Sequence, residues 1–243
     1  MKIQILELIE GAKKAEGLSV VIDVFRAFTT ECYCFDGGAK VCYPIGSMED
    51  AFALKEAHPD WVLLGERGGA KVEGCDLGNS PWDASNYDFR GKTMIHSTSA
   101  GTQGIVNAAG ANASEIITGS LVNAKAIAEY IRAKDPETVS LIAMGKAGVE
   151  RVPEDLLAAE YIRALLEGTP FDIDGRIDYL KDHGGEQFFD PAQAHIFPRE
   201  DYPLCVAYDR FPFVLRVETG DAPEHSGRTL RICRVDQPFS AKQ

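Results

Sequence analysis

The 243-residue sequence has few basic residues and no long hydrophobic run. No stretch approaches the roughly 18 to 20 uninterrupted apolar residues that a membrane-spanning helix requires. The 25 Lys and Arg residues are outnumbered by 37 Asp and Glu residues, which gives a formal net charge of −12. Because nucleic acids and anionic membranes attract basic surfaces, this charge argues against both as partners. We therefore expect a small molecule or another protein as the partner.

Signals for export and for disulfides are also missing. Residues 1–17 carry Glu7, Glu10 and Glu16 and lack the basic, apolar and small-residue succession of a signal peptide, so we expect a cytoplasmic protein. Six cysteines are present, but no two form a CxxC pair and none has zinc-finger spacing. Because the chain is too long to depend on disulfides, we expect reduced and mostly buried thiols.

Motifs of several common mechanisms are absent. The histidines show no metal-ligand or triad spacing, and only His96 lies near the predicted site, where we favour an orienting or packing role. No GxSxG elbow occurs, which argues against Ser97 or Ser99 as an acyl-transfer nucleophile. Segment 96–104 is not a Walker P-loop, because no lysine follows a GxxxxG pattern.

Short apolar segments alternate with helical patterns from residue 18 onward. This rhythm predicts a mostly parallel sheet with helices on both faces. We expect strands at 18–24, 40–45, 61–65, 92–97, 114–118 and 138–144, and helices at 26–38, 47–58, 99–110, 120–134 and 153–168. The sequence is less regular from about residue 170, with two final strands at 213–217 and 229–235. No linker marks a boundary, so we expect residues 1–243 to form a single domain.

Polar residues follow five of the predicted strands. In an open parallel sheet, the ligand crevice lies beyond the carboxyl ends of the strands, so these residues are the candidates for a common site. Helix capping would explain Ser99 or Ser120 alone, but it does not explain the whole set. The residues are Asp23 with Arg26, then Gly65, Glu66 and Arg67, then Ser97, Thr98 and Ser99, then Ser120 with Asn123, and finally Gly145 with Lys146.

The segment HSTSAGTQG (96–104) combines hydroxyl groups and small residues at a strand-to-helix turn. Backbone N–H groups at a helix N-terminus, together with hydroxyls and glycines, form a seat for an oxyanion or a phosphate. The alternative is an ordinary capped helix that packs closely through its small residues.

Two further segments carry charged residues that suit anion and cation binding. Segment 65–81 contains five glycines, and a glycine-rich loop of this length is often functional. Its Arg67 suits an anion, although a surface loop with a salt bridge remains the alternative. Pro153 predicts a helix start, where Glu154 or Asp155 could join Asp23 as an oxygen ligand. Oxygen ligands favour Mg²⁺ over zinc.

The motifs resemble those of the 2-phosphosulfolactate phosphatase family. The matching segments are VVIDVFRAFTT (20–30), GERGG (65–69), GCDLGNSP (74–81), TSAGTQG (98–104), GSLVNAKAIA (119–128) and AMGKAGVERVPEDLLAAEYI (143–162). The resemblance implies a three-layer α/β/α fold with a mostly parallel or mixed sheet. It also implies a Mg²⁺-dependent phosphatase that converts 2-phospho-3-sulfolactate to 3-sulfolactate and phosphate on a route to coenzyme M.

A doubly anionic substrate suggests roles for the candidate residues. We expect Asp23, Glu66 and Asp155 to hold Mg²⁺, which stabilises the phosphoryl transition state. Arg26 would neutralise substrate oxygens. The predicted catalytic residues are therefore Asp23, Arg26 and Glu66. The predicted substrate-binding residues are Arg67, Asn79, Ser97, Thr98, Ser99, Gly101, Thr102 and Asn123.

Several alternatives stay open at this level. The nucleophile is either a metal-bound water or Asp23 itself, which would form an aspartyl phosphate. The substrate could instead be another 2-phospho hydroxy acid, or the chain could be a non-catalytic binder of organic anions. Folds of this type often pair through helices or edge strands, so a homo-oligomer is also an expectation.

Overall fold

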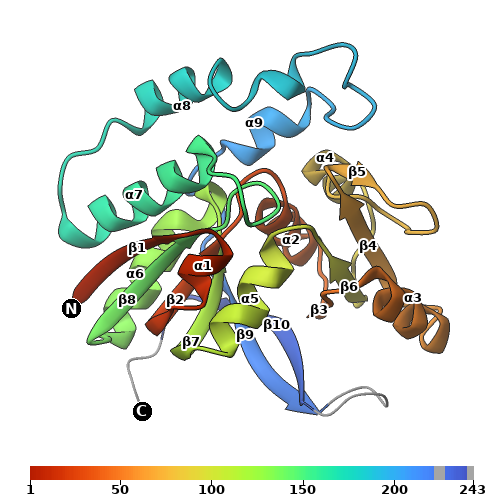
Figure 1. Ribbon diagram of the computed structural model, residues 1–243, viewed down its shortest axis with the longest axis horizontal. Coiled ribbons are helices and arrows are strands. Elements are labelled where there is room, and N and C mark those ends of the chain that lie inside the picture. Colours follow the sequence, from red (N-terminus) through yellow and green to blue (C-terminus); the bar gives the residue numbers. More distant parts are fainter. Residues whose placement is uncertain (222–227, 240–243) are drawn as a thin grey trace.

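The computed structural model describes residues 1–221 and 228–239, in which helices cover a mixed sheet (Figure 1). Ten strands form the sheet in the order β1-β8-β2-β7-β9-β10-β3-β6-β4-β5. The strands are β1 Lys2–Glu7, β2 Glu16–Ile22, β3 Val41–Pro44, β4 Val62–Arg67, β5 Ala70–Lys71, β6 Thr93–Ser97, β7 Asn112–Gly119, β8 Thr138–Ala143, β9 Phe213–Asp221 and β10 Arg228–Asp236. The helices are α1 Leu8–Ala12, α2 Ala27–Asp36, α3 Met48–Ala57, α4 Pro81–Ser85, α5 Gly101–Ala109, α6 Ala124–Lys134, α7 Pro153–Glu167, α8 Ile173–Lys181 and α9 Asp201–Cys205, with 3-10 turns η1 Leu121–Asn123 and η2 Glu186–Phe188.

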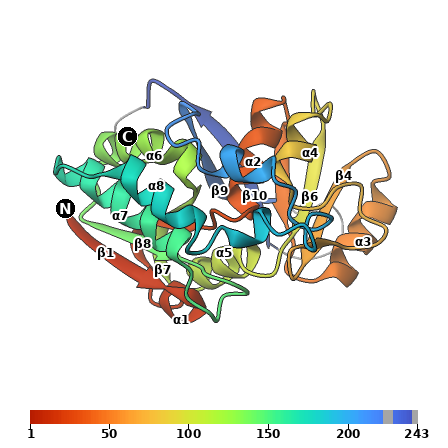
Figure 2. The same ribbon diagram turned by 90° about the horizontal axis from the view of Figure 1, so that it is seen from above.

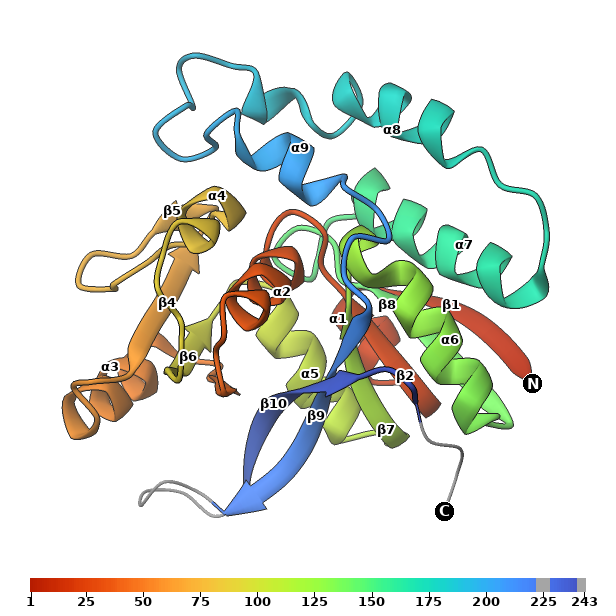
Figure 3. The ribbon, with the colours of Figure 1, turned by 180° about the vertical axis from the view of Figure 1, so that it is seen from behind.

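The sheet consists of two parallel blocks joined by an antiparallel hairpin. Strands β1, β8, β2 and β7 form the first block, and β3, β6 and β4 form the second, with β5 antiparallel to β4. The hairpin β9–β10 lies between them, with β9 antiparallel to β7 and β10 antiparallel to β3 (Figure 3). The register between β10 and β3 consists of the single pair Ile232 and Cys42. The C-terminal hairpin therefore lies in the middle of the sheet.

Helices cover both faces of the first block because successive side chains of a strand point to opposite sides. In β2, Val20 and Ile22 pack in the hydrophobic cluster under α6 and α7, whereas Val21 packs in the cluster under α1 and α5. Leu141 and Ile142 of β8 divide between the two clusters in the same way. This arrangement confirms the predicted three-layer α/β/α fold with a mixed sheet.

Two crossover helices connect the blocks. α2 leads from β2 in the first block to β3 in the second, and α5 leads from β6 in the second block back to β7. Both helices therefore begin at the carboxyl end of a strand. The segment from α8 to α9 lies over both blocks, since α8 contacts α7 and α9 contacts α4 (Figures 1 and 2).

The predicted elements agree with the structure in most of the chain. All strands and helices expected between residues 18 and 168 are present, and the two final strands lie within β9 and β10. Strand β1 was not predicted, because this edge strand is only partly buried and its apolar pattern is short. The six cysteines are free, and all but Cys233 are buried, as expected. None of the helices in the described residues has the length and apolar character to cross a membrane.

The close packing of α5 on β2 gives a first prediction. A Cβ atom at Gly104 would lie 2.5 Å from Met144 Sδ and 2.6 Å from Val21 Cγ1. Although alanine favours helices, we expect Gly104→Ala to lower the free energy of unfolding by about 1 to 3 kcal/mol through overpacking. Chemical unfolding measures this change.

Gly110, which caps the same helix, provides the control, because a Cβ there would approach no described atom closer than 3.6 Å. Gly110→Ala should change the free energy of unfolding by less than about 0.5 kcal/mol. An equal effect of both substitutions would show that α5 does not pack on β2 this closely.

Candidate active site

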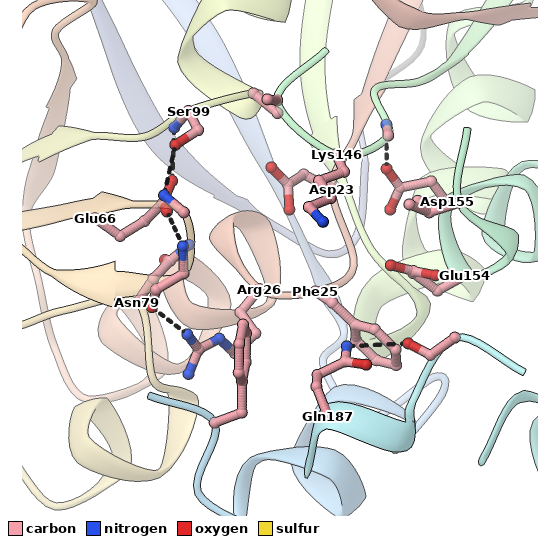
Figure 4. Close-up of a pocket in the computed structure, with 18 of the residues that line it drawn as sticks. Asp23, Phe25, Arg26, Glu66, Asn79, Ser99, Lys146, Glu154, Asp155 and Gln187 are labelled. Carbon is pink, nitrogen blue, oxygen red and sulfur yellow. Dashed lines mark hydrogen bonds between the residues drawn. The ribbon is translucent and has the colours of Figure 1, made fainter. Parts of the chain in front are cut away.

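A cavity of about 330 Å³ lies where the carboxyl ends of the strands meet (Figure 4). Residues after β2, β6 and β8, the end of β4, the start of α7 and the segment from 184 to 197 line it. Both blocks of the sheet therefore contribute to one site, as the polar strand ends predicted. The predicted site residues that line the cavity are Asp23, Arg26, Glu66, Asn79, Ser99 and Asp155.

Asp23 follows β2 and lies between the N-termini of the two crossover helices. Its Oδ1 accepts a hydrogen bond from the Ala27 N–H of α2 at 3.1 Å. Gly101 begins α5 so close to Asp23 that a Cβ there would lie 3.1 Å from Oδ2. Helix N-termini favour an anion, but burial and the charges of Asp155 and Glu66 raise the pKa of Asp23 well above its ordinary value.

Asp155 connects the ends of two strands through its carboxylate. Its Oδ1 accepts the Val24 N–H at 2.7 Å and its Oδ2 accepts the Gly145 N–H at 2.8 Å. Burial raises the pKa of Asp155 to about 6, against the lowering effect of these backbone donors. The neighbouring Glu154 is 6% exposed, and its Oε2 has no hydrogen-bond partner in the described residues. Burial and the charge of Asp155 raise the pKa of Glu154.

Glu66 performs the same connecting role in the second block. Its Oε1 accepts the Ser99 N–H at 2.6 Å, and its Oε2 accepts the Gly69 N–H at 2.8 Å. The carboxylate therefore joins the glycine-rich loop to the turn that follows β6. Four acidic side chains line the cavity from both sides, namely Asp23, Glu66, Glu154 and Asp155.

Arg26 provides a positive charge in the buried wall of the cavity. Its side chain is 2% exposed, and its Nη1 donates to Asp201 Oδ2 at 2.7 Å. Its Nη2 donates to the Gly69 carbonyl oxygen at 2.6 Å. Asp201 was not predicted, because it lies in the irregular C-terminal part, where no strand end or helical periodicity drew attention to it.

Six of the predicted substrate-binding residues do not line the cavity. Arg67 instead donates to the Glu66 carbonyl oxygen and to Ser97, which is fully buried. Thr98 and Thr102 hydrogen bond to each other at the start of α5. Asn123 accepts the Ser120 N–H through its Oδ1 in a capping box. These side chains hold the turns that carry the cavity residues. Gly101 lies beside Asp23.

A buried hydrogen-bond network lies behind Asn79. His96 Nδ1 lies 2.8 Å from Glu31 Oε1, and His96 Nε2 lies 3.2 Å from Asn79 Oδ1. These contacts hold the His96 imidazole between Glu31 and Asn79, so an orienting or packing role of His96 stays a prediction. Ligand atoms of Glu31, Cys42 and His96 lie within 4.8 Å of one another, so this triad could hold a metal ion. Sequence spacing missed the triad because its members come from three separate elements.

Comparison with known proteins identifies the family. A family model described as 2-phosphosulpholactate phosphatase matches residues 3–183. The chain belongs to this family. Membership makes the chain an enzyme, a phosphoric monoester hydrolase, and confirms the resemblance carried by the sequence motifs.

Curated relatives show how far the similarity extends, and each of the following is named "Probable 2-phosphosulfolactate phosphatase". The chain is 34% identical to the protein of Bacillus subtilis (strain 168) over 212 residues, which cover 85% of this chain and 90% of the relative. It is 41% identical to that of Carboxydothermus hydrogenoformans over 167 residues, with 68% of each covered. It is 37% identical to that of Thermus thermophilus over 156 residues, with 63% and 65% covered.

The carboxylate cluster makes stability depend on pH. Folding raises the pKa of Asp155 from 3.8 to about 6, so the folded chain binds this proton more tightly than the unfolded chain. The bound proton therefore contributes up to about 3 kcal/mol to the free energy of unfolding. This contribution is fully present below about pH 4 and is lost as the pH rises through about 6. Chemical unfolding with a chelator across this range measures the decline.

Asp155→Asn removes the titrating group, so the free energy of unfolding of this variant should decline less between about pH 4 and about pH 7. Equal declines in the variant and the unmodified chain would contradict the assignment to Asp155.

Proposed function

We propose that this chain is a Mg²⁺-dependent phosphatase that hydrolyses 2-phospho-3-sulfolactate to 3-sulfolactate and phosphate. The observation that carries the proposal is the cavity in which four carboxyl groups from both blocks lie near the buried Arg26. The names of the family and of its curated relatives support the substrate. The product would then enter a route to coenzyme M.

The acidic side chains fit a magnesium ion in their chemistry. All donors are carboxylate oxygens. Burial raises the pKa of Asp23, and repulsion from the charges of Asp155 and Glu66 raises it further. A divalent cation would remove this repulsion. Mg²⁺ usually binds one or two carboxylates and keeps several waters, so Asp23 with Asp155 or Glu66 suffices to hold it. The ion would supply charge neutralisation at a phosphoryl oxygen.

The residues of the chain would bind the phosphoryl group and transfer protons. Arg26 neutralises oxygens of the group, and the N–H groups that begin α2 and α5 complement its charge. Either a water attacks phosphorus directly, or Asp23 attacks it and a water then hydrolyses the aspartyl phosphate; in both cases the bond between phosphorus and the substrate oxygen breaks. Glu154 is suited to protonate that oxygen, because the residue lines the cavity and its buried Oε2 has no hydrogen-bond partner among the described residues.

The buried triad of Glu31, Cys42 and His96 would serve a different purpose from the magnesium site. Its sulfur and nitrogen donors suit softer metals than Mg²⁺, and none of its members lines the cavity. The proposal also includes three further expectations from the sequence. They are a cytoplasmic location, a single domain over residues 1–243 and assembly into a homo-oligomer.

Asp23→Asn tests the catalytic assignment. We expect phosphate release from 2-phospho-3-sulfolactate to fall by at least about 1,000-fold, because the variant loses a metal ligand and the candidate nucleophile. Chelation should abolish turnover, and Mg²⁺ should restore it. Release of inorganic phosphate measures both effects.

Cys42→Ser is the matched control for the metal. This variant should keep Mg²⁺-dependent turnover, because it alters only the buried triad. Full turnover by Asp23→Asn would disprove the assignment. Binding of the substrate without turnover by the unmodified chain would instead support a non-catalytic organic-anion binder.

Lys146 provides a test of substrate choice. Its side chain is 73% exposed at the cavity, where Arg26 is the other cation among the described lining residues. We expect Lys146→Met to lower kcat/KM for 2-phospho-3-sulfolactate by about tenfold, because the sulfonate of the substrate would lose a charged partner.

With 2-phospholactate, which lacks the sulfonate, the same substitution should have a smaller effect. A competition assay with both esters measures the ratio of the two kcat/KM values. Equal losses would contradict a sulfonate contact at Lys146, and a preference of the unmodified chain for 2-phospholactate would favour another 2-phospho hydroxy acid as the substrate.

A further inference from the structure

Three groups hold the guanidinium of Arg26 in place. Asp201 Oδ2 accepts a hydrogen bond from Nη1 at 2.7 Å, and the Gly69 carbonyl oxygen accepts one from Nη2 at 2.6 Å. The Phe197 ring packs against the guanidinium, with its centroid 4.7 Å from Cζ. A guanidinium is a rigid plane, so these contacts together fix the direction of its remaining N–H bonds.

Asp201 is fully buried and touches Arg26 without lining the cavity. Its second oxygen, Oδ1, accepts the Ser80 hydroxyl at 2.6 Å and the Trp82 N–H at 3.0 Å. The carboxylate thus connects α9 to the start of α4 and to the arginine that follows β2. It lies beyond residues 3–183, the part matched by the family model.

We propose that Asp201 is a positioning residue, which aims the Arg26 guanidinium at the phosphoryl oxygens of the ligand. This inference rests on the proposed function only for the identity of the ester. An arginine side chain loses much conformational freedom when it is held in one geometry. Asp201 holds the Arg26 side chain in one geometry before the ligand binds, so the ligand meets a preorganised guanidinium.

The two oxygens of Asp201 have separate partners, which makes a selective substitution available. In Asp201→Asn, the amide oxygen can keep the bonds from Ser80 and Trp82. The amide nitrogen then faces Arg26 Nη1, so two donors oppose each other and the guanidinium turns away. In this orientation of the amide, the connection to α4 is kept, while the contact with Arg26 is lost.

Binding of inorganic phosphate in the presence of Mg²⁺, measured by calorimetry on the full chain, tests the proposal. We expect Arg26→Ala and Asp201→Asn each to weaken phosphate binding by about tenfold or more, since each removes a charge-assisted contact or its alignment. In the Arg26→Ala background, Asp201→Asn should have no further effect on the dissociation constant. A further loss of similar size would show that Asp201 does not act through Arg26.

Ser80→Ala is the matched control. It removes the other side-chain hydrogen bond to the same carboxylate, and it also removes a cap of α4. We expect lower stability of this variant but phosphate affinity within about twofold of the unmodified chain. If Ser80→Ala weakens phosphate binding as much as Asp201→Asn does, Asp201 has only a structural role.

A second measurement applies if Asp201→Asn alone does not fold because Arg26 is left unpaired. Methylguanidinium is added to Arg26→Ala and to the double variant Arg26→Ala/Asp201→Asn, in which no buried charge of the pair remains. We expect the additive to restore phosphate affinity only when Asp201 is present. Equal restoration in both variants, or none in either, would overturn the proposal.

These binding measurements do not depend on which ester the enzyme hydrolyses. If phosphate binding shows the coupling but 2-phospho-3-sulfolactate is not turned over, only the proposed substrate fails. If the ester is hydrolysed but the coupling is absent, only the role of Asp201 fails.

Discussion

The site depends on placing several carboxyl groups together away from water. Asp23, Glu66, Glu154 and Asp155 would repel one another and lose hydration at this position. The fold compensates with backbone N–H groups, which reach Asp155 from the ends of two strands and Glu66 from two loops. In the proposed function, the remaining negative charge of the cluster would attract a divalent cation.

The split sheet explains how these donors reach one point. Each crossover helix leaves one block and enters the other, so the N-termini of α2 and α5 both lie beside Asp23. The segment over the two blocks then adds Arg26's partners, Phe197 and Asp201. Neither block has a complete site by itself, because the residues that line the cavity come from both blocks and from the segment that lies over them.

Local sequence predicted much of this arrangement. Polar residues at strand ends located Asp23, Glu66 and Ser99 at one cavity, because the carboxyl ends of parallel strands meet. The same rule over-predicted Ser97 and Asn123, since neighbouring side chains at a strand end point in different directions and some cap the turn itself. Asp201 was missed because its role depends on a tertiary ion pair, which leaves no periodic trace in the sequence.

The central position of β9 and β10 has a consequence for biosynthesis. A ribosome releases a chain from its N-terminus, so β7 and β3 are made long before the hairpin that pairs with both. Until then, both strands present open edges that can capture a second nascent chain. Pairing of β9 with β7 and of β10 with β3 therefore covers both open edges and joins the two blocks into one sheet.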